Sequence, residues 1–319
     1  MSNNRVLLIG AGEMGQEYYR VLKEQNVDVT ILTRSMSSAA EFTAKMGKNV
    51  EIFENFAFEE NQFTHAINAV SVGSLKAVNE HLFSLSIPRI LCEKPAGLSI
   101  DEVRKLLKNK PNCVDFFVGY NRRFYSSVEY IKNKIEKGYL IRSVHLDFSE
   151  IFWKIDRANV EDAAIQNWFF ANSTHTLDLL ISLIGKPEFL RSNAFQVPSK
   201  NTIFDGNDVF HGFGRSQQGI PFSYHADFHS AGRWKIDIGT NECIFTLSPL
   251  EEVSKVKIGN LNSDVVFKRS ELDLKFKPGL FRQCEAFLTG GEGLVSLEEH
   301  VSNCVFYEHV KDGLDWPKH

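Results

Sequence analysis

Residues 5–15 read Arg-Val-Leu-Leu-Ile-Gly-Ala-Gly-Glu-Met-Gly, an apolar run that leads directly into glycines spaced G-x-G-x-x-G. Gly10 permits a tight turn, Gly12 lets the backbone approach a pyrophosphate, and Gly15 lets the next helix pack closely on the strand. A helix-compatible segment follows at residues 16–25. Its free N–H groups and positive dipole end can hold phosphates. This stretch therefore predicts a strand–turn–helix unit that binds a dinucleotide.

Short apolar segments alternate with helical patterns through the first part of the chain. Strands are expected at residues 6–9, 29–32, 66–72, 90–92 and 116–119. Helices are expected at residues 13–25, 37–46, 74–85 and 100–108, the last with Ser99 as its N-cap. This alternation is typical of a parallel sheet with helices on both faces. We therefore expect an α/β, doubly wound domain over residues 1–122.

The pattern changes after residue 123, where strands follow one another with Gly or Pro between them. Helices are expected at residues 126–137, 173–184 and 297–310, the last packing back on the molecule. Strands are expected at residues 143–152, 208–215, 220–229, 234–238 and 242–247. Consecutive strands predict a largely antiparallel sheet. Because 319 residues exceed the usual size of one core, residues 123–319 are expected to form a second, α+β domain.

Composition excludes several classes of partner. The net charge is −4 and the basic residues are scattered, so neither nucleic acid nor a membrane surface is expected as a partner. The polar start leads directly into the first strand and no apolar run approaches the ~20 residues of a membrane span, which predicts a cytoplasmic protein. The five cysteines show no C-x-x-C spacing, so we expect reduced core residues and no metal.

A lysine follows a strand of the predicted parallel sheet, in the segment Leu91-Cys-Glu-Lys-Pro95. Ligands of open α/β sheets bind outside the carboxyl ends of the strands, so Lys94 is expected to face the cofactor crevice. Its ammonium can hydrogen-bond a substrate oxygen and stabilise the charge that develops there. The alternative is a solvated loop lysine.

Cofactor choice can be predicted from the end of the second strand, Leu32-Thr-Arg-Ser35. NAD enzymes usually place Asp or Glu there to bind the ribose 2′-hydroxyl. Arg34 can instead pair with a 2′-phosphate, while Thr33 and Ser35 can hydrogen-bond it. NADP(H) is therefore expected in preference to NAD(H), the alternative being an exposed arginine indifferent to the phosphate.

Four motifs together resemble the Gfo/Idh/MocA family of glucose-fructose oxidoreductase, inositol dehydrogenase and rhizopine-catabolism proteins. They are Gly10-Ala-Gly-Glu-Met-Gly15, Cys92-Glu-Lys-Pro95, Val118-Gly-Tyr-Asn-Arg-Arg-Phe124 and Asn172-Ser-Thr-His-Thr-Leu-Asp178. The resemblance implies an N-terminal Rossmann domain and a C-terminal α+β domain whose open sheet often forms an oligomer interface, here as a dimer or tetramer. It also implies NAD(P)-dependent oxidation or reduction of a sugar or related polyol.

The resemblance implies roles for individual residues. Lys94 would contact cofactor and substrate hydroxyl, Glu93 would help fix the nicotinamide end, and His175 would be the general acid/base, for which an imidazole pKa near 6.5 is suited. The alternative for His175 is a structural histidine at a helix start. The residues expected to bind the cofactor are Gly10, Gly12, Glu13, Met14, Gly15, Thr33, Arg34, Ser35, Val70, Ser71, Glu93 and Lys94.

One position departs from the family pattern. The family's aspartate four residues before the histidine is replaced by Ala171, with Asn172 next to it. Asn172 cannot act as a base, but it can cap the following helix or orient a substrate. His175 would then act without that carboxylate, or the proton would come from Lys94, Tyr120 or solvent.

The residues expected to bind the substrate are Asn172, Tyr120, Trp168, Arg233 and Trp234. Arg233 and Trp234 can contact a sugar or a phosphate, or can serve as turn and packing residues. Residues expected to line the pocket wall are Trp153, Lys154, Asn167 and Trp168. The whole pattern predicts an NADP(H)-dependent oxidoreductase acting on a sugar, an activated sugar or a polyol-like compound. The alternative is a catalytically silent dinucleotide-sensing regulatory protein with the same fold.

Overall fold

The chain forms two compact units in the computed structural model, which describes residues 4–151, 155, 160–197 and 206–316. The first unit comprises residues 1–121 and 275–301, and the second comprises residues 122–274 and 302–319. Residues 275–301 thus return to the first unit, although the sequence-based division assigned them to the second. Trp153 and Lys154 lie outside the described residues.

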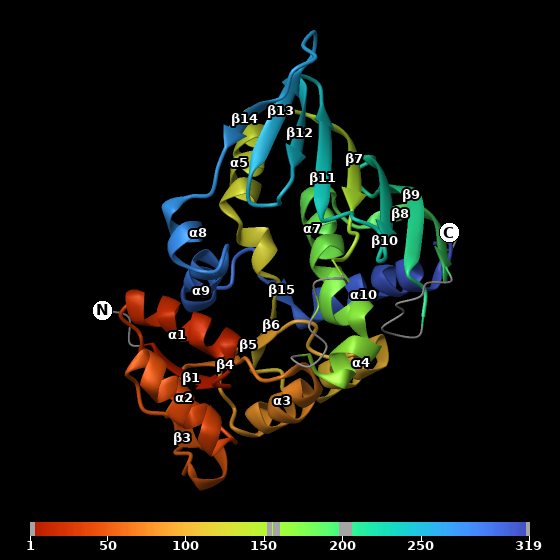
Figure 1. The fold of residues 1–319 in the computed structure, drawn as a ribbon. Helices are drawn as coiled ribbons and strands as arrows, with labels where there is room; N and C mark the ends of the chain where they lie inside the picture. Colours follow the sequence, from red (N-terminus) through yellow and green to blue (C-terminus); the bar gives the residue numbers. More distant parts are fainter. Residues whose placement is uncertain (1–3, 152–154, 156–159, 198–205, 317–319) are drawn as a thin grey trace. The chain divides into compact units, whose positions relative to one another are not determined.

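The first unit is built on a seven-stranded sheet in the order β15-β6-β5-β4-β1-β2-β3 (Figure 1). Its strands are β1 (Arg5–Ile9), β2 (Asp28–Thr33), β3 (Glu51–Ile52), β4 (His65–Asn68), β5 (Arg89–Glu93), β6 (Asp115–Gly119) and β15 (Val295–Ser296). All neighbouring strands are parallel except the short edge pair β15–β6. The order 3-2-1-4-5-6 is that of the doubly wound dinucleotide-binding fold, which confirms the expected fold class.

Five helices accompany this sheet: α1 (Glu13–Glu24), α2 (Met36–Met46), α3 (Leu75–Ser84), α4 (Ile100–Asn109) and α9 (Leu280–Thr289). α1 packs beside α2 and α9, and α3 packs beside α4. Because the strands run outward from β1 in one direction and from β4 in the other, right-handed crossovers put these two groups on opposite faces. Ser99 caps α4 as predicted, since its hydroxyl accepts a hydrogen bond from the Glu102 N–H at 3.3 Å.

The second unit contains an eight-stranded sheet in the order β14-β13-β12-β11-β7-β10-β9-β8. Its strands are β7 (Ile141–Asp147), β8 (Pro187–Phe195), β9 (Val209–Ser216), β10 (Pro221–Asp227), β11 (Lys235–Thr240), β12 (Cys243–Leu247), β13 (Val253–Lys257) and β14 (Asp264–Phe267). Only β7 and β10 pair in parallel, so the sheet is largely antiparallel as expected. The strand predicted to reach residue 152 ends at Asp147, and β8, β13 and β14 were not predicted.

The two faces of this sheet differ in burial. Val144, Leu146 and Ile236 point to a buried face. On the other face His145 Nδ1 lies 2.9 Å from the Ser223 hydroxyl in an exposed pair. The helices of the unit are α5 (Ser126–Glu136), α6 (Asp162–Gln166), α7 (Thr174–Ile184), α8 (Glu271–Lys275) and α10 (Leu297–Asp312), of which α8 and α10 cross a boundary between the two units along the chain. One face of the sheet is therefore covered and the other is open.

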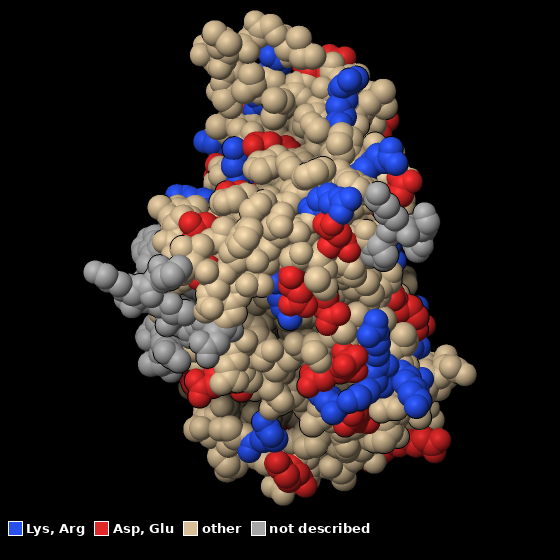
Figure 2. Space-filling model, turned by 90° about the vertical axis from the view of Figure 1, so that its right-hand side faces the viewer, with Lys and Arg blue, Asp and Glu red and all other residues tan. Residues whose placement is uncertain are grey.

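The surface carries charges of both signs. On the face drawn in Figure 2, acidic and basic side chains are interspersed and form no patch of one sign. None of the helices within the described ranges has both the length and the apolar character needed to cross a bilayer. All five cysteines are free, but Cys113 is exposed. The expectation that every cysteine is a core residue is therefore wrong for Cys113, which lies in a turn before β6.

Candidate active site

Steric contacts explain why glycines occupy this turn. Gly10 has φ +117°, and a Cβ there would lie 2.4 Å from the Ala69 carbonyl oxygen. A Cβ on Gly15 would lie 2.0 Å from the Gly10 carbonyl oxygen, whereas one on Gly12 would meet no protein atom within 4 Å. Gly10 and Gly15 are thus required by the chain's own backbone. The space beside Gly12 is not filled by protein, as a site for a close-lying ligand requires.

A pocket of about 310 Å³ opens at the carboxyl ends of β1, β2 and β4. Its walls are formed by Ile9, Gly10, Ala11, Gly12, Thr33, Arg34, Ser35, Ser38, Phe53, Ala69, Val70, Ser71 and Val78. Seven residues predicted to bind the cofactor are among them, and Glu13, Met14 and Gly15 begin α1 next to Gly12. Val70 and Ser71 lie in the loop after β4, because the strand predicted at 66–72 ends at Asn68. The lining contains no Asp or Glu.

The end of β2 is organised by short polar side chains. Ser35 caps α2, its hydroxyl accepting the Ser38 N–H at 3.2 Å. Arg34 is exposed, and its Nη2 donates to the Ser74 hydroxyl at 2.8 Å. Its guanidinium is paired with no carboxylate of the described residues, which leaves its charge available to an anion in the pocket.

A lysine from far along the sequence lies beside the first turn of α1. Gly12 is the N-cap and supplies no side chain to the free N–H groups of the helix. Lys277 Nζ lies 3.0 Å from Met14 Sδ in that turn. Its segment is held in place because Asn121 Nδ2 donates to the Pro278 carbonyl at 2.9 Å. No pattern in the sequence indicated this position of Lys277.

Glu93 ends β5 and binds a helix of the same unit. Its Oε1 accepts a hydrogen bond from the Tyr18 hydroxyl at 2.7 Å, and Gln283 Nε2 donates to the same hydroxyl at 3.0 Å. Burial, followed by the nearby Glu93 charge, raises the pKa of Tyr18 well above its ordinary value, so the phenol keeps the proton that it donates. The Glu93 carboxylate is therefore held against α1.

Lys94 lies half-buried in the turn after β5, at the carboxyl edge of the sheet. This turn is supported by α10, because His300 Nε2 donates to the Pro95 carbonyl at 2.8 Å. The ring of Tyr120 packs 5.6 Å from that of His300, and Tyr120 is buried. Lys94 and Tyr120 thus lie around one turn, while neither lines the pocket beside the glycines.

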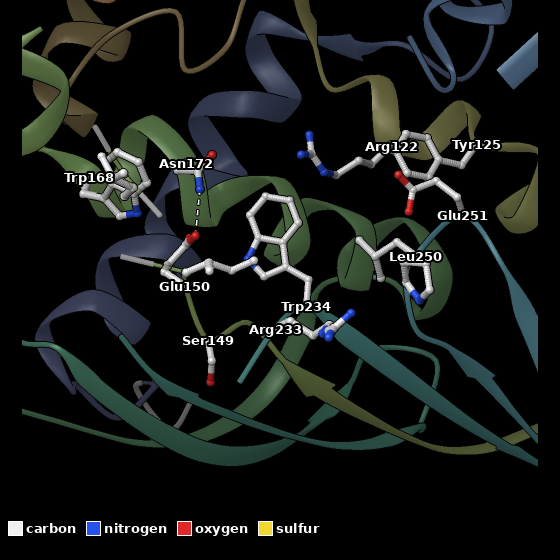
Figure 3. A pocket seen from close by; sticks show the side chains of 13 residues that line it. Arg122, Tyr125, Ser149, Glu150, Trp168, Asn172, Arg233, Trp234, Leu250 and Glu251 are labelled. Carbon is white, nitrogen blue, oxygen red and sulfur yellow. Dashed lines mark hydrogen bonds between the residues drawn. The ribbon is translucent and has the colours of Figure 1, made fainter. Parts of the chain in front are cut away.

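The second unit holds a separate pocket of about 410 Å³ (Figure 3). It is lined by Arg122, Tyr125, Ser149, Glu150, Ile151, Ile155, Trp168, Asn172, Arg233, Trp234, Pro249, Leu250 and Glu251. Four residues predicted to bind substrate, Trp168, Asn172, Arg233 and Trp234, are brought together here. Asn167 was also predicted to line the pocket wall, but it is not among the lining residues. Its Nδ2 donates to the Ala163 carbonyl at 3.0 Å.

Glu150 is a buried carboxylate in this pocket, with 4% of its surface exposed. Asn172 Nδ2 donates to Oε2 at 2.8 Å and the Ser173 hydroxyl donates to Oε1 at 2.7 Å (Figure 3). Sequence reasoning missed this residue. A signal was present, because Glu150 continues the alternation of the buried residues Val144, Leu146 and Phe148.

The chain before α7 is already helical. Residues Phe169–Ser173 form a π-helical turn that continues directly into α7. The helix predicted at residues 173–184 is therefore preceded by helical residues and does not begin at residue 173. The interpretation of Asn172 as a helix cap is therefore wrong, because Asn172 lies inside a helical segment and its side chain binds Glu150. π-Helical turns recur at functional sites because they redirect side chains.

His175 lies buried in the first turn of α7, with its ring 6.2 Å from that of Trp234. It does not itself line the pocket. One turn along, Asp178 accepts hydrogen bonds from Arg123 Nε at 2.7 Å and Nη2 at 2.8 Å. This buried ion pair anchors the helix that carries His175. On Trp234, the guanidinium of Arg122 lies 4.4 Å from the ring centre.

Among the described residues, no three His, Cys, Asp or Glu side chains are grouped so as to hold a metal ion. The polar groups instead form two sets. One set surrounds a glycine turn in the first unit, and the other surrounds two tryptophans in the second. The first suits a phosphate-bearing ligand and the second suits a ring that carries hydroxyl groups.

A family model described as shikimate/quinate 5-dehydrogenase matches residues 1–72, which contain the glycine turn. The rhizopine catabolism protein MocA of Rhizobium meliloti is 25% identical over 209 residues, 65% of this chain and 64% of that protein. The 4-carboxy-2-hydroxymuconate-6-semialdehyde dehydrogenase of a Sphingobium strain is 26% identical over 206 residues, 61% of this chain and 62% of that protein. Each match thus spans less than two thirds of the relative.

A solved structure of levoglucosan dehydrogenase in complex with NADH and levoglucosan shares the fold along nearly the whole chain. The TM-score is 0.76 at 15% identity, with 96% of each chain covered. At this identity the likeness concerns the fold. The match to MocA agrees with the resemblance to the Gfo/Idh/MocA oxidoreductases that the four motifs carry, and the shared fold is consistent with it.

Proposed function

We propose that this protein is an NADP(H)-dependent oxidoreductase that interconverts CH–OH and C=O groups on a sugar, an activated sugar or a polyol-like compound. The observation that carries the proposal is the glycine turn, in which two glycines are required by the backbone and only Gly12 faces open space. Uncapped N–H groups of α1 complete a site for a pyrophosphate. Levoglucosan dehydrogenase, solved with NADH, supports a nicotinamide cofactor.

The proposed preference for NADP(H) rests on this chain's own residues. Arg34 has no carboxylate partner among the described residues, and Ser35 and Ser38 lie beside it in a pocket without acidic side chains. An acid would bind a ribose 2′-hydroxyl and repel a 2′-phosphate, whereas a guanidinium and hydroxyl groups attract the phosphate.

In the proposed reaction the nicotinamide, when bound, exchanges the hydride. Lys94 hydrogen-bonds the reacting oxygen and stabilises the negative charge that develops on it. Its place supports this role, because the turn after β5 lies at the edge of the sheet where ligands of such folds bind. Glu93, held by Tyr18, keeps the start of the same turn in position.

His175 is the proposed proton carrier, with Lys94, Tyr120 and solvent as the other candidates. The family's aspartate is Ala171 here. Glu150 nevertheless brings a carboxylate to the pocket from the end of β7, bound to Asn172 next to that position. This carboxylate supports an enzyme over the alternative, a catalytically silent dinucleotide sensor.

The sugar-like substrate class is supported by the pocket of the second unit. Trp168 and Trp234 provide apolar ring faces, while Asn172 and Ser149 provide hydrogen-bonding groups beside them. Small-molecule sites usually have a mostly apolar wall with a few polar groups.

The test is a titration of the purified protein with NADPH and NADH. We expect NADPH to bind at least about tenfold more tightly, equivalent to about 1.4 kcal/mol, and Arg34→Asp to abolish the difference. Equal affinities in the unchanged protein would overturn the NADP(H) assignment. Cofactor binding without any substrate-dependent change in NADPH absorbance across a panel of sugars and polyols would favour the sensor.

We also propose that the protein is a homo-oligomer. Its support is the open face of the second unit's sheet, where Phe213 and Ile244 are 57% and 50% exposed. Exposed apolar residues on a wide sheet face favour a self-complementary contact. Light scattering during gel filtration measures the mass, and Phe213→Lys should shift it toward that of one chain.

A further inference from the structure

We propose that the pocket of the second unit binds a substrate with a negatively charged substituent, a carboxylate or a phosphate, and that Arg233 binds this group. The inference rests on the proposed function in one respect, namely that this pocket holds the substrate.

Arg233 is an exposed arginine at the wall of this pocket, and it has no charged partner among the described residues. It lines the pocket, and its guanidinium makes no hydrogen bond or ion pair with any residue that the structure describes. A guanidinium beside an apolar wall attracts an anion, because a charge-assisted hydrogen bond is stronger than a neutral one.

The turn that carries Arg233 is tightly constrained. The Gly232 N–H donates to the Ser230 hydroxyl at 3.1 Å. A Cβ on Gly232 would lie 2.6 Å from the Cβ of Ser149, which also lines the pocket, so only glycine allows this approach. On the other side of Arg233, Trp234 is packed between Arg122 and His175. Both neighbours of Arg233 are therefore held, and its side chain lies next to Trp234 at the wall of the pocket (Figure 3).

The other charges of the pocket do not cancel that of Arg233. Glu251 is paired with Arg269, whose Nη2 lies 3.3 Å from its Oε1. Both oxygens of Glu150 accept hydrogen bonds from Asn172 and Ser173. Glu150 keeps its negative charge, but among the described residues the cations Arg122, Arg233 and Arg269 still outnumber the carboxylates of Glu150 and Glu251 by one.

The geometry selects the chemistry of the ligand. A guanidinium binds a carboxylate or a phosphate through two parallel hydrogen bonds. The ring of Trp234 follows directly in sequence and lines the same pocket, so it can contact the apolar face of a sugar ring whose acidic group reaches Arg233. The pocket thereby discriminates an acidic sugar from its neutral counterpart.

The experiment is calorimetric titration of the protein, in the presence of saturating NADPH, with D-glucose, D-glucuronate and D-glucose 6-phosphate. We expect at least one acidic sugar to bind about tenfold or more tightly than glucose. Arg233→Gln should reduce this preference to within about twofold. Arg142→Gln is the matched control, because Arg142 is an exposed arginine of β7 that does not line the pocket; it should retain the preference.

The two acidic probes distinguish a carboxylate from a phosphate. If neither binds more tightly than glucose, or if Arg233→Gln retains the preference, the proposal is overturned. Failure of the proposed function gives a different result: NADPH does not bind to the first unit, or no sugar is oxidised or reduced, while titration without cofactor still shows the acidic preference and its loss in Arg233→Gln.

Discussion

The two pockets of this protein are built by opposite means. The pocket of the first unit is made by backbone at the ends of adjacent strands, and glycines give it its shape. The pocket of the second unit is made by large side chains from segments spread between Arg122 and Glu251. A site formed by backbone depends on local steric rules that a few residues satisfy. A site formed by side chains depends on how distant segments pack.

The largest expected effect separates the two roles of glycine in the first pocket. Gly15→Ala should prevent correct packing of α1 and abolish cofactor binding, because its Cβ would lie 2.0 Å from the Gly10 carbonyl oxygen. Gly12→Ala should leave the free energy of unfolding nearly unchanged, since its Cβ meets no protein atom, yet should weaken NADPH binding by about 100-fold or more through contact with the pyrophosphate.

Thermal unfolding and NADPH titration of both variants measure these effects. Normal NADPH affinity in a folded Gly12→Ala variant would show that the cofactor does not use the space beside Gly12. It would contradict the assignment of Gly12 to cofactor binding and of Gly15 to backbone packing.

The next effect concerns chemistry and not binding. Lys94→Ala should lower turnover by about 10²–10³-fold, because the reacting oxygen loses its charged hydrogen-bond donor, while the NADPH dissociation constant changes little. Lys105→Ala, an exposed lysine of α4, is the control and should not change turnover. Unchanged turnover in Lys94→Ala would remove Lys94 from the reaction. The assay is NADPH absorbance with a substrate found in the sugar panel.

Acid should weaken the first unit through His65 of β4. Burial, with the charge of Arg89, lowers the pKa of His65 to about 4, against 6.5 for an exposed imidazole. The unfolded chain therefore binds more protons below about pH 6.5, and stability falls as the pH decreases from there to about 4, by about 3 kcal/mol for this residue.

Denaturant unfolding of the protein and of His65→Phe, at about pH 7 and about pH 4.5, measures this loss. Phe is a fitting replacement because His65 packs edge-on against Phe287 with ring centres 5.0 Å apart. The variant should lose less stability on acidification than the unchanged protein, and an equal loss would assign the effect to other groups.

A smaller effect tests the side-chain site. Glu150→Gln replaces one acceptor oxygen by a donor, which leaves Asn172 or Ser173 without its buried partner. We expect the free energy of unfolding to fall by about 1–3 kcal/mol and sugar binding to weaken, with NADPH binding unchanged. Calorimetry with both ligands checks this, and an equal loss of NADPH and sugar affinity would contradict the independence of the two pockets.

The smallest effect concerns the lysine beside α1. Lys277→Met should weaken NADPH binding by a few-fold, about 1 kcal/mol or less, because an exposed ammonium near the phosphates is screened by water and salt. Lys277→Arg should retain the affinity, and the difference between the variants should shrink at high ionic strength. A difference that does not change with salt would indicate a packing effect on Met14.

Much of the first unit could be predicted because its signals are local. Short apolar strands, the Ser99 cap and the glycine spacing each depend on neighbouring residues, and the parallel, doubly wound arrangement followed from the alternation of strands and helices. In the second unit β8, β13 and β14 were missed. Their sequences contain polar and exposed positions, such as those at the solvent face of β8, so apolar periodicity is weak.

The candidate substrate pocket shows the same limit at the level of single residues. Trp168, Arg233 and Trp234 were chosen for residue type and position near a motif, and they do line one pocket. Glu150 was missed although it follows β7 at the spacing of the buried residues Leu146 and Phe148. Asn172 was interpreted as a cap because the π-helical turn before α7 has no sequence signature that propensity can detect.

The sequence by itself determined the dinucleotide-type turn, the doubly wound order and the exclusion of an acid at the end of β2, because steric limits on glycine and the period of apolar residues act over a few neighbours. Only the tertiary structure decided that residues 275–301 return to the first unit, that Lys277 reaches α1, and that Asn172 binds Glu150. Such contacts depend on the sum of many weak packing energies across the chain, which no short segment contains.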